Sequence, residues 1–308
     1  MPFRLPVLSE GEIESLGQMS FCAAMAQMVN LMFGTHVTAW DVECCVGRNP
    51  VRLTDLKRKV RILEQWHNPG GTVRWMVTAL GKLLGKEETG ERGSWLEIGV
   101  RMAALAATLS RWSRNGKKIG VSCVSGDFSQ VLAAWYLREM GFPIGTVICA
   151  CNENNAIWEL FCHGQLRTGL MPIKTNTPDA DVVVPDGLER LIFAAGGYAE
   201  VMGYLDALDR GGVYCPGEGT LQNLQKGMSV CVVSSHRIGD TIAGVYGTDA
   251  HILSPYGALA YAGLMDHRTK AGEICQGLLV VDKSPALDAD TIAEALGINA
   301  EDLKNALY

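Results

Sequence analysis

No stretch of this sequence approaches the roughly 20 consecutive apolar residues that a membrane-spanning helix needs. Residues 1–6 also lack the apolar core and the cleavage site of a secretory signal. Long runs of one charge sign are missing as well, because acidic and basic residues are interspersed and the net charge is only −6. We therefore expect neither nucleic acid nor a membrane as a partner.

Paired cysteines are a further absence. The chain has ten cysteines, but none of them form the Cys-x-x-Cys spacing of metal and redox sites, and most lie in apolar runs. This pattern is typical of buried, reduced thiols, which predicts a cytoplasmic protein without a metal site.

The sequence is rich in apolar residues that follow two alternating patterns. Hydrophobic residues make up 48% of the 308 positions and charged residues 19%, which is enough to bury a large core. Segments with helical spacing alternate with short apolar runs that are typical of strands. This order predicts an α/β fold of three layers, with a mostly parallel sheet and helices on both of its faces.

The expected elements follow one another along the whole chain. Strands are expected at residues 50–54, 60–66, 117–123, 144–150, 182–184, 228–234 and 278–281. Helices are expected at residues 10–34, 38–46, 72–84, 94–112, 131–140, 154–164, 187–193, 198–208, 220–226, 238–246 and 256–265, followed by two short ones capped by Asp288 and Asn299. Residues 85–93 form the most polar, glycine-rich connector.

The first candidate site is the turn that connects the strand expected at 117–123 to the helix expected at 131–140. The free N–H groups and the positive end of a helix dipole at such a turn can hold an anion. An ordinary strand–helix turn would carry a glycine equally well. The candidate binding residues are Gly126, Asp127, Phe128, Ser129 and Gln130.

Three runs around this turn stand in a recognisable order. They are residues 125–134 (SGDFSQVLAA), 140–145 (MGFPIG) and 149–155 (CACNENN). Together they resemble the threonine synthase family, a branch of the fold-type-II enzymes that use pyridoxal phosphate (PLP). The resemblance implies that residues 93–308 form the large α/β domain of that family. Residues 1–92 would supply helices and two strands that lead to the lysine-bearing helix, within one compact unit.

The same resemblance places an arginine where the family has its Schiff-base lysine. Residues 62–75 (ILEQWHNPGGTVRW) are similar to the family's run into the lysine helix, with Arg74 at the lysine position. A Schiff base needs a deprotonated primary amine. A guanidinium, with a pKa above about 12, cannot supply one. Lys82 on the same expected helix points another way, so Arg74 is predicted to be a lost catalytic group.

Other positions depart from the family where it touches cofactor or substrate. Asp127 and Ser129 replace the asparagine and the second glycine of its phosphate loop, and a carboxylate there repels a phosphate by roughly 1 kcal/mol or more. Asp282 takes the place of the threonine expected near the pyridine nitrogen. His67 and Asn152 are further cleft candidates. The connector at 85–93 stands where the family has a whole small domain, which we expect to be deleted.

These departures predict a threonine synthase-like pseudoenzyme that binds no cofactor and has a regulatory or ligand-binding role. Two alternatives stay open. The chain could be a PLP-dependent lyase that acts on O-phosphohomoserine or a related amino acid. It could also be a different enzyme that uses His67, Asp127 and Arg74 as polar groups in the same cleft.

Loss of the small domain would leave an apolar surface uncovered. Its members are Trp66, Val73, Trp75, Met76 and Trp95. Soluble monomers rarely expose a contiguous patch larger than about a few hundred Å². We therefore expect a homodimer or a partner protein, and a small anionic metabolite is a further candidate partner.

Overall fold

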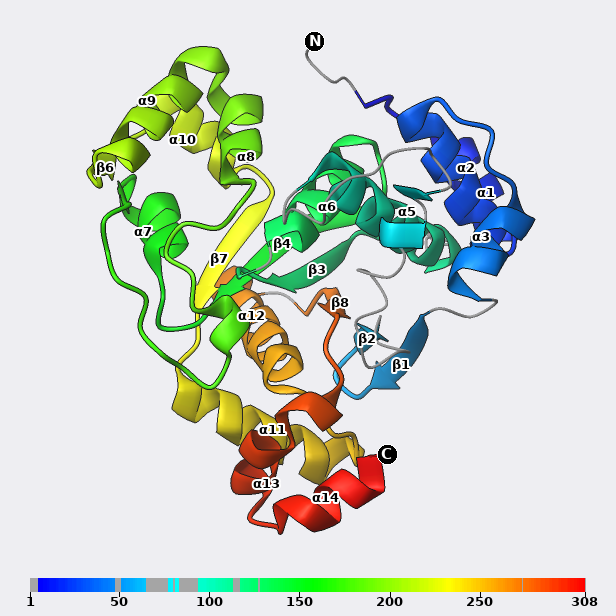
Figure 1. The fold of residues 1–308 in the computed structure, drawn as a ribbon, viewed down its shortest axis with the longest axis vertical. Helices are drawn as coiled ribbons and strands as arrows, with labels where there is room; N and C mark the ends of the chain where they lie inside the picture. The colour runs from blue at the N-terminus through cyan, green and yellow to red at the C-terminus, as the bar shows by residue number, and fades with distance from the viewer. Residues whose placement is uncertain are drawn as a thin grey trace.

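A six-stranded sheet runs through the centre of the computed structural model, which describes residues 5–47, 51–64, 77–79, 81–82, 94–112, 117–126, 128–272 and 274–307 (Figure 1). The strand order is β1-β2-β8-β3-β4-β7. The strands are β1 (Arg52–Leu56), β2 (Val60–Glu64), β3 (Ile119–Val124), β4 (Ile144–Cys151), β7 (Met228–Val232) and β8 (Gln276–Val281). Strands β1 and β2 pair antiparallel and all other neighbours pair parallel, so the prediction of a mostly parallel sheet is confirmed.

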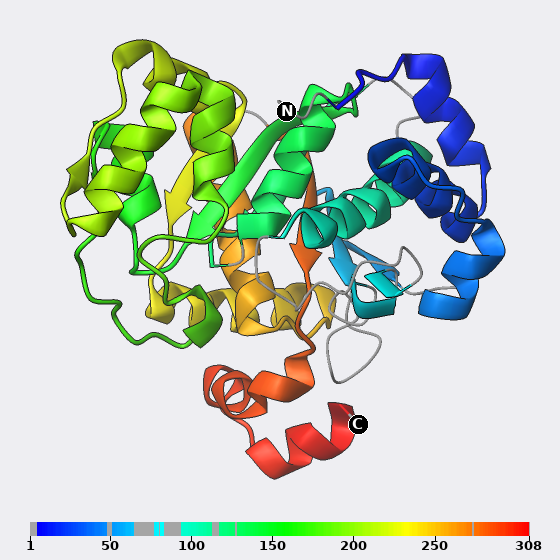
Figure 2. The same cartoon turned by 45° about the horizontal axis from the view of Figure 1, so that its top comes forward.

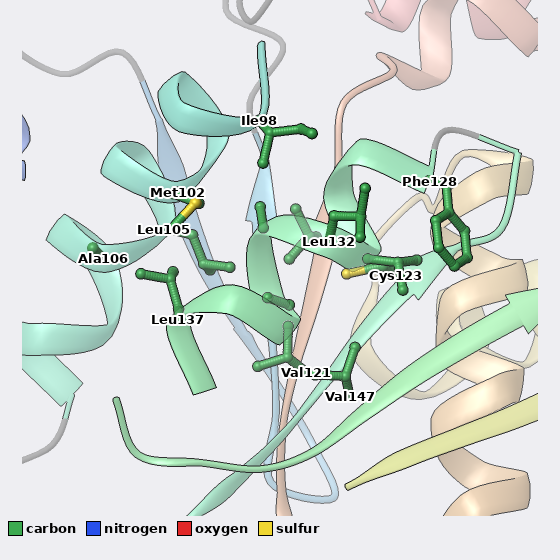
Figure 3. Packing of buried hydrophobic residues seen from close by; sticks show 14 of the residues in the cluster. Ile98, Met102, Leu105, Ala106, Val121, Cys123, Phe128, Leu132, Leu137 and Val147 are labelled. Atoms are coloured by element: carbon green, nitrogen blue, oxygen red, sulfur yellow. The ribbon is translucent and has the colours of Figure 1, made fainter. Parts of the chain in front are cut away.

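Helices cover both faces of the sheet, as the sequence predicts. On one face lie α5 (Trp95–Trp112) and α6 (Phe128–Glu139), and on the other lie α11 (Ser235–Asp249) and α12 (Pro255–Ala271). Successive side chains of a strand point to opposite faces. Along β4, Cys149 and Cys151 accordingly belong to the α5–α6 core, whereas Ile148 and Ala150 belong to the α11–α12 core. Figure 3 shows the first of these cores, with Val121 and Val147 of the sheet facing Leu132 and Leu137 of α6.

The remaining elements form three groups around this centre. Beside α5 lie α1 (Glu10–Gln18), α2 (Phe21–Phe33) and α3 (Ala39–Val46). At the opposite end lie α7 (Ala156–His163), α8 (Leu188–Gly196), α9 (Tyr198–Asp209), α10 (Glu218–Gln225) and the two-stranded sheet of β5 (Leu166–Arg167) and β6 (Val213–Tyr214) (Figure 2). The chain ends in α13 (Ala289–Leu296) and α14 (Ala300–Leu307), next to α11.

The helix expected at residues 10–34 is divided in two, which corrects that prediction. Ser9 and Glu12 form a capping box that begins α1, and Ser20 begins α2 by accepting a hydrogen bond from the N–H of Ala23 (3.2 Å). A serine that bonds the backbone in this way opens a new helix. The predicted end at Gly34 is confirmed, with φ at +65°.

The strand expected at residues 182–184 does not form in the structure. The N–H of Val182 turns back to the carbonyl of Ala180 (2.8 Å), and Pro185 has no N–H to offer a neighbouring strand. Val183 packs instead into the core on the α5–α6 side. The apolar triplet is therefore a buried connection that leads into α8.

Several further expectations concern element ends and single residues. Asn299 caps α14 as predicted, whereas Asp288 precedes α13 without making a capping bond. Of the helix expected at 72–84, residues 77–79 and 81–82 are described and are helical. The connector at 85–93 lies outside the described residues, and the deletion of a small domain there stays a prediction. All ten cysteines are free thiols. Within the described ranges, no helix is long and apolar enough to cross a membrane.

Candidate functional site

The parallel strands β2, β8, β3 and β4 end at one edge of the sheet, and residues far apart in the sequence meet there. Glu64 ends β2, Asp282 follows β8, Gly126 follows β3 and Asn152 follows β4. Ligands of open α/β folds bind at this carboxyl edge. The predicted site residues Asn152 and Asp282 and the turn at 125–130 are thus brought to the same side. His67, Arg74 and Asp127 lie outside the described residues.

An ion-pair network at this edge joins α5 to the residue that follows β8. Arg101 donates from Nη2 to Oε1 of Glu97, one turn earlier in the helix (3.0 Å), and from Nη1 to Oδ2 of Asp282. The side chains of Arg101, Glu97 and Asp282 are 7%, 15% and 20% exposed. A guanidinium can bridge two carboxylates because its donors form a planar fork. Asp282, which the resemblance places near a pyridine nitrogen, is therefore already engaged by a cation.

The first turn of α6 belongs to the same network. Ser129 is fully buried and donates to Oε1 of Glu97 (3.4 Å). Phe128 is 1% exposed within the hydrophobic core, and Gln130 is 7% exposed. Three of the five predicted binding residues of the turn are thus core residues of α6 rather than groups that line an open site.

Gly126 is needed for a close backbone contact. A Cβ at this position would collide with the carbonyl oxygen of Asp179 and with the Cα of Ala180, which belong to the short helix η1 (Pro178–Ala180). Only glycine leaves room for another backbone at such a distance. The turn that was expected to face an anion is instead covered on this side by residues 179–180.

Two side chains hold this covering segment in place. Lys283, directly after Asp282, forms an ion pair with Asp179, and its Nζ lies 4.8 Å from the centre of the Tyr256 ring. The backbone N–H of Asp179 donates to the Tyr256 hydroxyl (3.2 Å), which in turn donates to Oδ2 of Asp179 (3.3 Å). Burial raises the pKa of Tyr256, so its hydroxyl keeps the proton that this second bond requires.

Asn152 has a structural role that its motif did not reveal. Its Nδ2 donates to Thr175 (3.0 Å), Thr177 (3.0 Å) and Asp181 (2.8 Å), and its Oδ1 accepts from the backbone N–H of Asn154 (2.9 Å). The side chain is fully buried. Asn152 therefore fastens the loop at 173–181 to the end of β4. Both the nitrogen and the oxygen of its side-chain amide form hydrogen bonds.

Glu64 and His251 form a further pair of ionisable side chains at the end of β2, and the sequence analysis did not predict it. Glu64 is 5% exposed, and its Oε1 lies 3.4 Å from Nε2 of His251. Its other oxygen accepts from the hydroxyl of Thr54 (3.3 Å) and lies 3.8 Å from Nε of Arg52. A carboxylate at the end of a strand that is mostly apolar was the available signal. The pairing with His251, 187 positions later, could not be read from the sequence.

The described residues do not fit the phosphate end of the cofactor that the resemblance implies. A phosphate at a helix N-terminus needs free donors and an open approach. Here Ser129 is buried against a carboxylate, and the backbone of 179–180 lies against Gly126. We therefore assign no catalytic step to that group.

No protein-family model matches the chain. Among curated proteins, it is 33% identical to a threonine synthase of Corynebacterium glutamicum over 98 residues, which are 30% of this chain and 20% of that protein. It is 28% identical to threonine synthase-like 1 of Homo sapiens over 149 residues, 47% of this chain and 20% of that protein. Each match thus spans about a fifth of the relative's length.

A solved structure extends the comparison to the whole fold. The PLP-bound threonine synthase of Brucella melitensis aligns with a TM-score of 0.83 at 17% sequence identity, covering 100% of this chain and 88% of that one. The fold is that of the fold-type-II class. The chain is thus similar to threonine synthases, in sequence over part of its length and in its fold as a whole, and the resemblance found in its motifs is confirmed.

Proposed function

We propose that this threonine synthase-like chain is a pseudoenzyme, which keeps the large α/β scaffold of its relatives for a regulatory or ligand-binding role. The observation that carries the proposal is the ion pair between Arg101 and Asp282. The resemblance assigns the position of Asp282 to the contact with the pyridine nitrogen. A ring nitrogen at this point would meet a carboxylate whose charge is already paired with a largely buried guanidinium, and this guanidinium would repel a protonated ring.

The sequence at the position of the family's catalytic lysine supports the same proposal. Arg74 stands at the lysine position of the family's motif, and an arginine cannot be deprotonated to act as a nucleophile. The covering of Gly126 by residues 179–180 adds a steric argument at the phosphate end. Lysine, phosphate turn and pyridine contact would each have to change before the chemistry of the relatives could run.

The alternative is a PLP-dependent lyase, and one observation favours it. Oδ1 of Asp282 is buried and has no hydrogen-bond partner within the described part of the chain. A protonated ring nitrogen could donate to this oxygen without displacing Arg101 from Oδ2. The alternative then needs a lysine other than the residue at position 74.

Phosphate release from O-phosphohomoserine separates the two functions. The purified chain, with and without added PLP, is compared with the threonine synthase of Corynebacterium glutamicum at equal concentration. The pseudoenzyme account predicts release at the rate of the protein-free control in both samples. Release that depends on PLP and scales with the concentration of this chain would establish the lyase instead.

Association with a second copy or with a partner protein is a further proposal. Of the five apolar side chains on which it rests, Trp95 is described, and it packs on Phe33 and Tyr136 of its own chain at centroid distances of 6.4 and 5.7 Å. Trp66, Val73, Trp75 and Met76 lie outside the described residues. Light scattering at a protein concentration of tens of micromolar tests the proposal. A monomer at that concentration would exclude the homodimer.

A further inference from the structure

Helix α9 carries an exposed apolar stripe at the periphery of the molecule (Figures 1 and 2). Tyr198, Met202 and Leu205 are 71%, 45% and 37% exposed. Asp209 continues the same row, so the successive steps are four, three and four residues. These steps return to one face of a helix, and they are the spacing of a two-stranded coiled coil. The helix packs on its own chain through another face, which contains the buried Tyr204.

The size of the apolar surface matches what one side of a stable dimer provides. Leu208 of α9 and Phe193 in the last turn of α8 enlarge the stripe and are 39% and 45% exposed. The five apolar residues together present roughly 450 Å², taking about 200 Å² for each fully exposed residue. A standard interface buries about 800 Å² per partner, of which about 57% is apolar. The patch therefore supplies the apolar share of one such interface.

The two ends of the stripe are complementary to each other. At the C-terminal end, Asp209 forms no ion pair or hydrogen bond with any residue that the structure describes. At the N-terminal end, the N-cap residue is Gly197, which has no side chain to cap the first N–H groups of α9. A carboxylate is stabilised near the positive end of a helix dipole. An antiparallel second copy would bring Asp209 of each chain to this N-terminus of the other.

The orientation of the two copies follows from the same residues. In a parallel pair, Asp209 would face the identical carboxylate of the second copy, and the two charges would repel each other. In an antiparallel pair, Met202 of each chain lies against Leu205 of the other. The hydroxyl of Tyr198 then lies next to Asp209 and can donate to it. Every contact occurs twice, as an interface with two-fold symmetry requires.

We propose that two copies of this chain associate through α9, antiparallel across a two-fold axis. The dimer rests on the association proposed above and places it on a surface that includes none of the tryptophans. The network of Arg101 and Asp282 has no part in it. The loss of catalysis and the α9 interface can therefore be tested independently.

Sedimentation equilibrium on the full chain at tens of micromolar tests the proposal. We expect a dimeric wild type, and a dissociation constant about a hundredfold higher in Met202→Glu, because the interface contains the substitution twice at about tenfold each. Tyr198→Glu replaces this variant if circular dichroism shows that it does not fold. The matched control is Leu287→Glu, which adds the same charge at a side chain that is 55% exposed outside α8 and α9, and it should dimerise like the wild type.

Asp209→Asn tests the orientation. Its dissociation constant should rise about threefold or more, because a contact with a helix dipole is lost twice. A tighter dimer in this variant would overturn the antiparallel arrangement, since only a parallel pair gains from removal of the charge. A dimer that Met202→Glu leaves intact would overturn the α9 interface alone and assign the association to another surface. A monomeric wild type would overturn both the interface and the association.

Discussion

Arg101 donates to Asp282, which lies 181 residues further along the chain, and thereby joins α5 to the end of β8 at the edge where relatives of this fold would hold a ligand. Its other donors reach Glu97 in the preceding turn. One guanidinium thus forms ion pairs with two carboxylates in a largely buried place. This bridge is structural, and it stands at a position where the resemblance to threonine synthases implies a binding group.

Substituting Arg101→Met should destabilise the protein strongly. The change leaves Glu97 and Asp282 without their shared counter-charge, and breaking a buried pair in this way costs about 3–5 kcal/mol of the free energy of unfolding. The control is Arg210→Met, whose partner Asp206 lies at 2.7 Å in a pair with side chains 76% and 57% exposed, and about 1 kcal/mol or less is expected there. Urea denaturation measures both, and equal losses in the two variants would contradict the structural role.

Substituting Gly126→Ala tests the covering of the turn by residues 179–180. The new Cβ would overlap two backbone atoms that cannot rotate away, and overpacking of this kind costs about 1–3 kcal/mol. Gly11→Ala is the matched control, because no atom lies within 4 Å of the added carbon and alanine is favoured in the interior of a helix. A Gly126→Ala variant as stable as the wild type would show that segment 179–180 does not lie on the turn.

The predictions from sequence succeeded where the local pattern decides the structure. Strand β3, the turn and α6 were placed correctly because an apolar run, a glycine and helical spacing follow one another within 25 residues. The role of the turn could not be predicted in the same way. Gly126 reads as a phosphate-loop glycine, and the chain that covers it comes from residues 179–180, which no local pattern places there.

The buried polar groups explain what sequence reasoning missed. Arg101 and Glu97 stand four residues apart in a helix whose other residues are mostly apolar, which indicates an intrahelical pair but not the third partner, Asp282. Asn152 was read as a cleft residue because its motif is shared with enzymes. Its actual partners, Thr175, Thr177 and Asp181, lie 23, 25 and 29 residues further along the chain, where no local pattern links them to Asn152.

Glu200 should make the stability of the protein depend on pH in the acid range. Hydrogen bonds from Tyr214, and then from Gly217 and Thr220, hold the pKa of Glu200 below its ordinary value of 4.5. A lowered folded-state pKa contributes stability above the ordinary value, and this contribution is lost as the pH falls through the folded-state pKa. Because glutamine keeps an acceptor oxygen and Glu200 is only partly buried, Glu200→Gln should lower the free energy of unfolding at pH 7 by about 1 kcal/mol.

The difference between wild type and Glu200→Gln should shrink as the pH falls from 5 towards 2. Glu218→Gln, on the exposed face of α10, is the control and should stay within about 0.5 kcal/mol of the wild type. Thermal unfolding followed at several pH values gives all three curves. A constant difference between wild type and Glu200→Gln over this range would show that the carboxylate charge of Glu200 is not what stabilises α9.

The absorption spectrum of the pure protein mixed with PLP and then dialysed tests the central claim most directly. We predict that wild type and Arg74→Lys both lose the added PLP on dialysis, because the phosphate turn and the Asp282 position are occupied by the protein's own groups. The Corynebacterium glutamicum threonine synthase serves as the positive control. A PLP band in the wild type that survives dialysis, and that borohydride fixes to one lysine of the chain, would contradict the pseudoenzyme account.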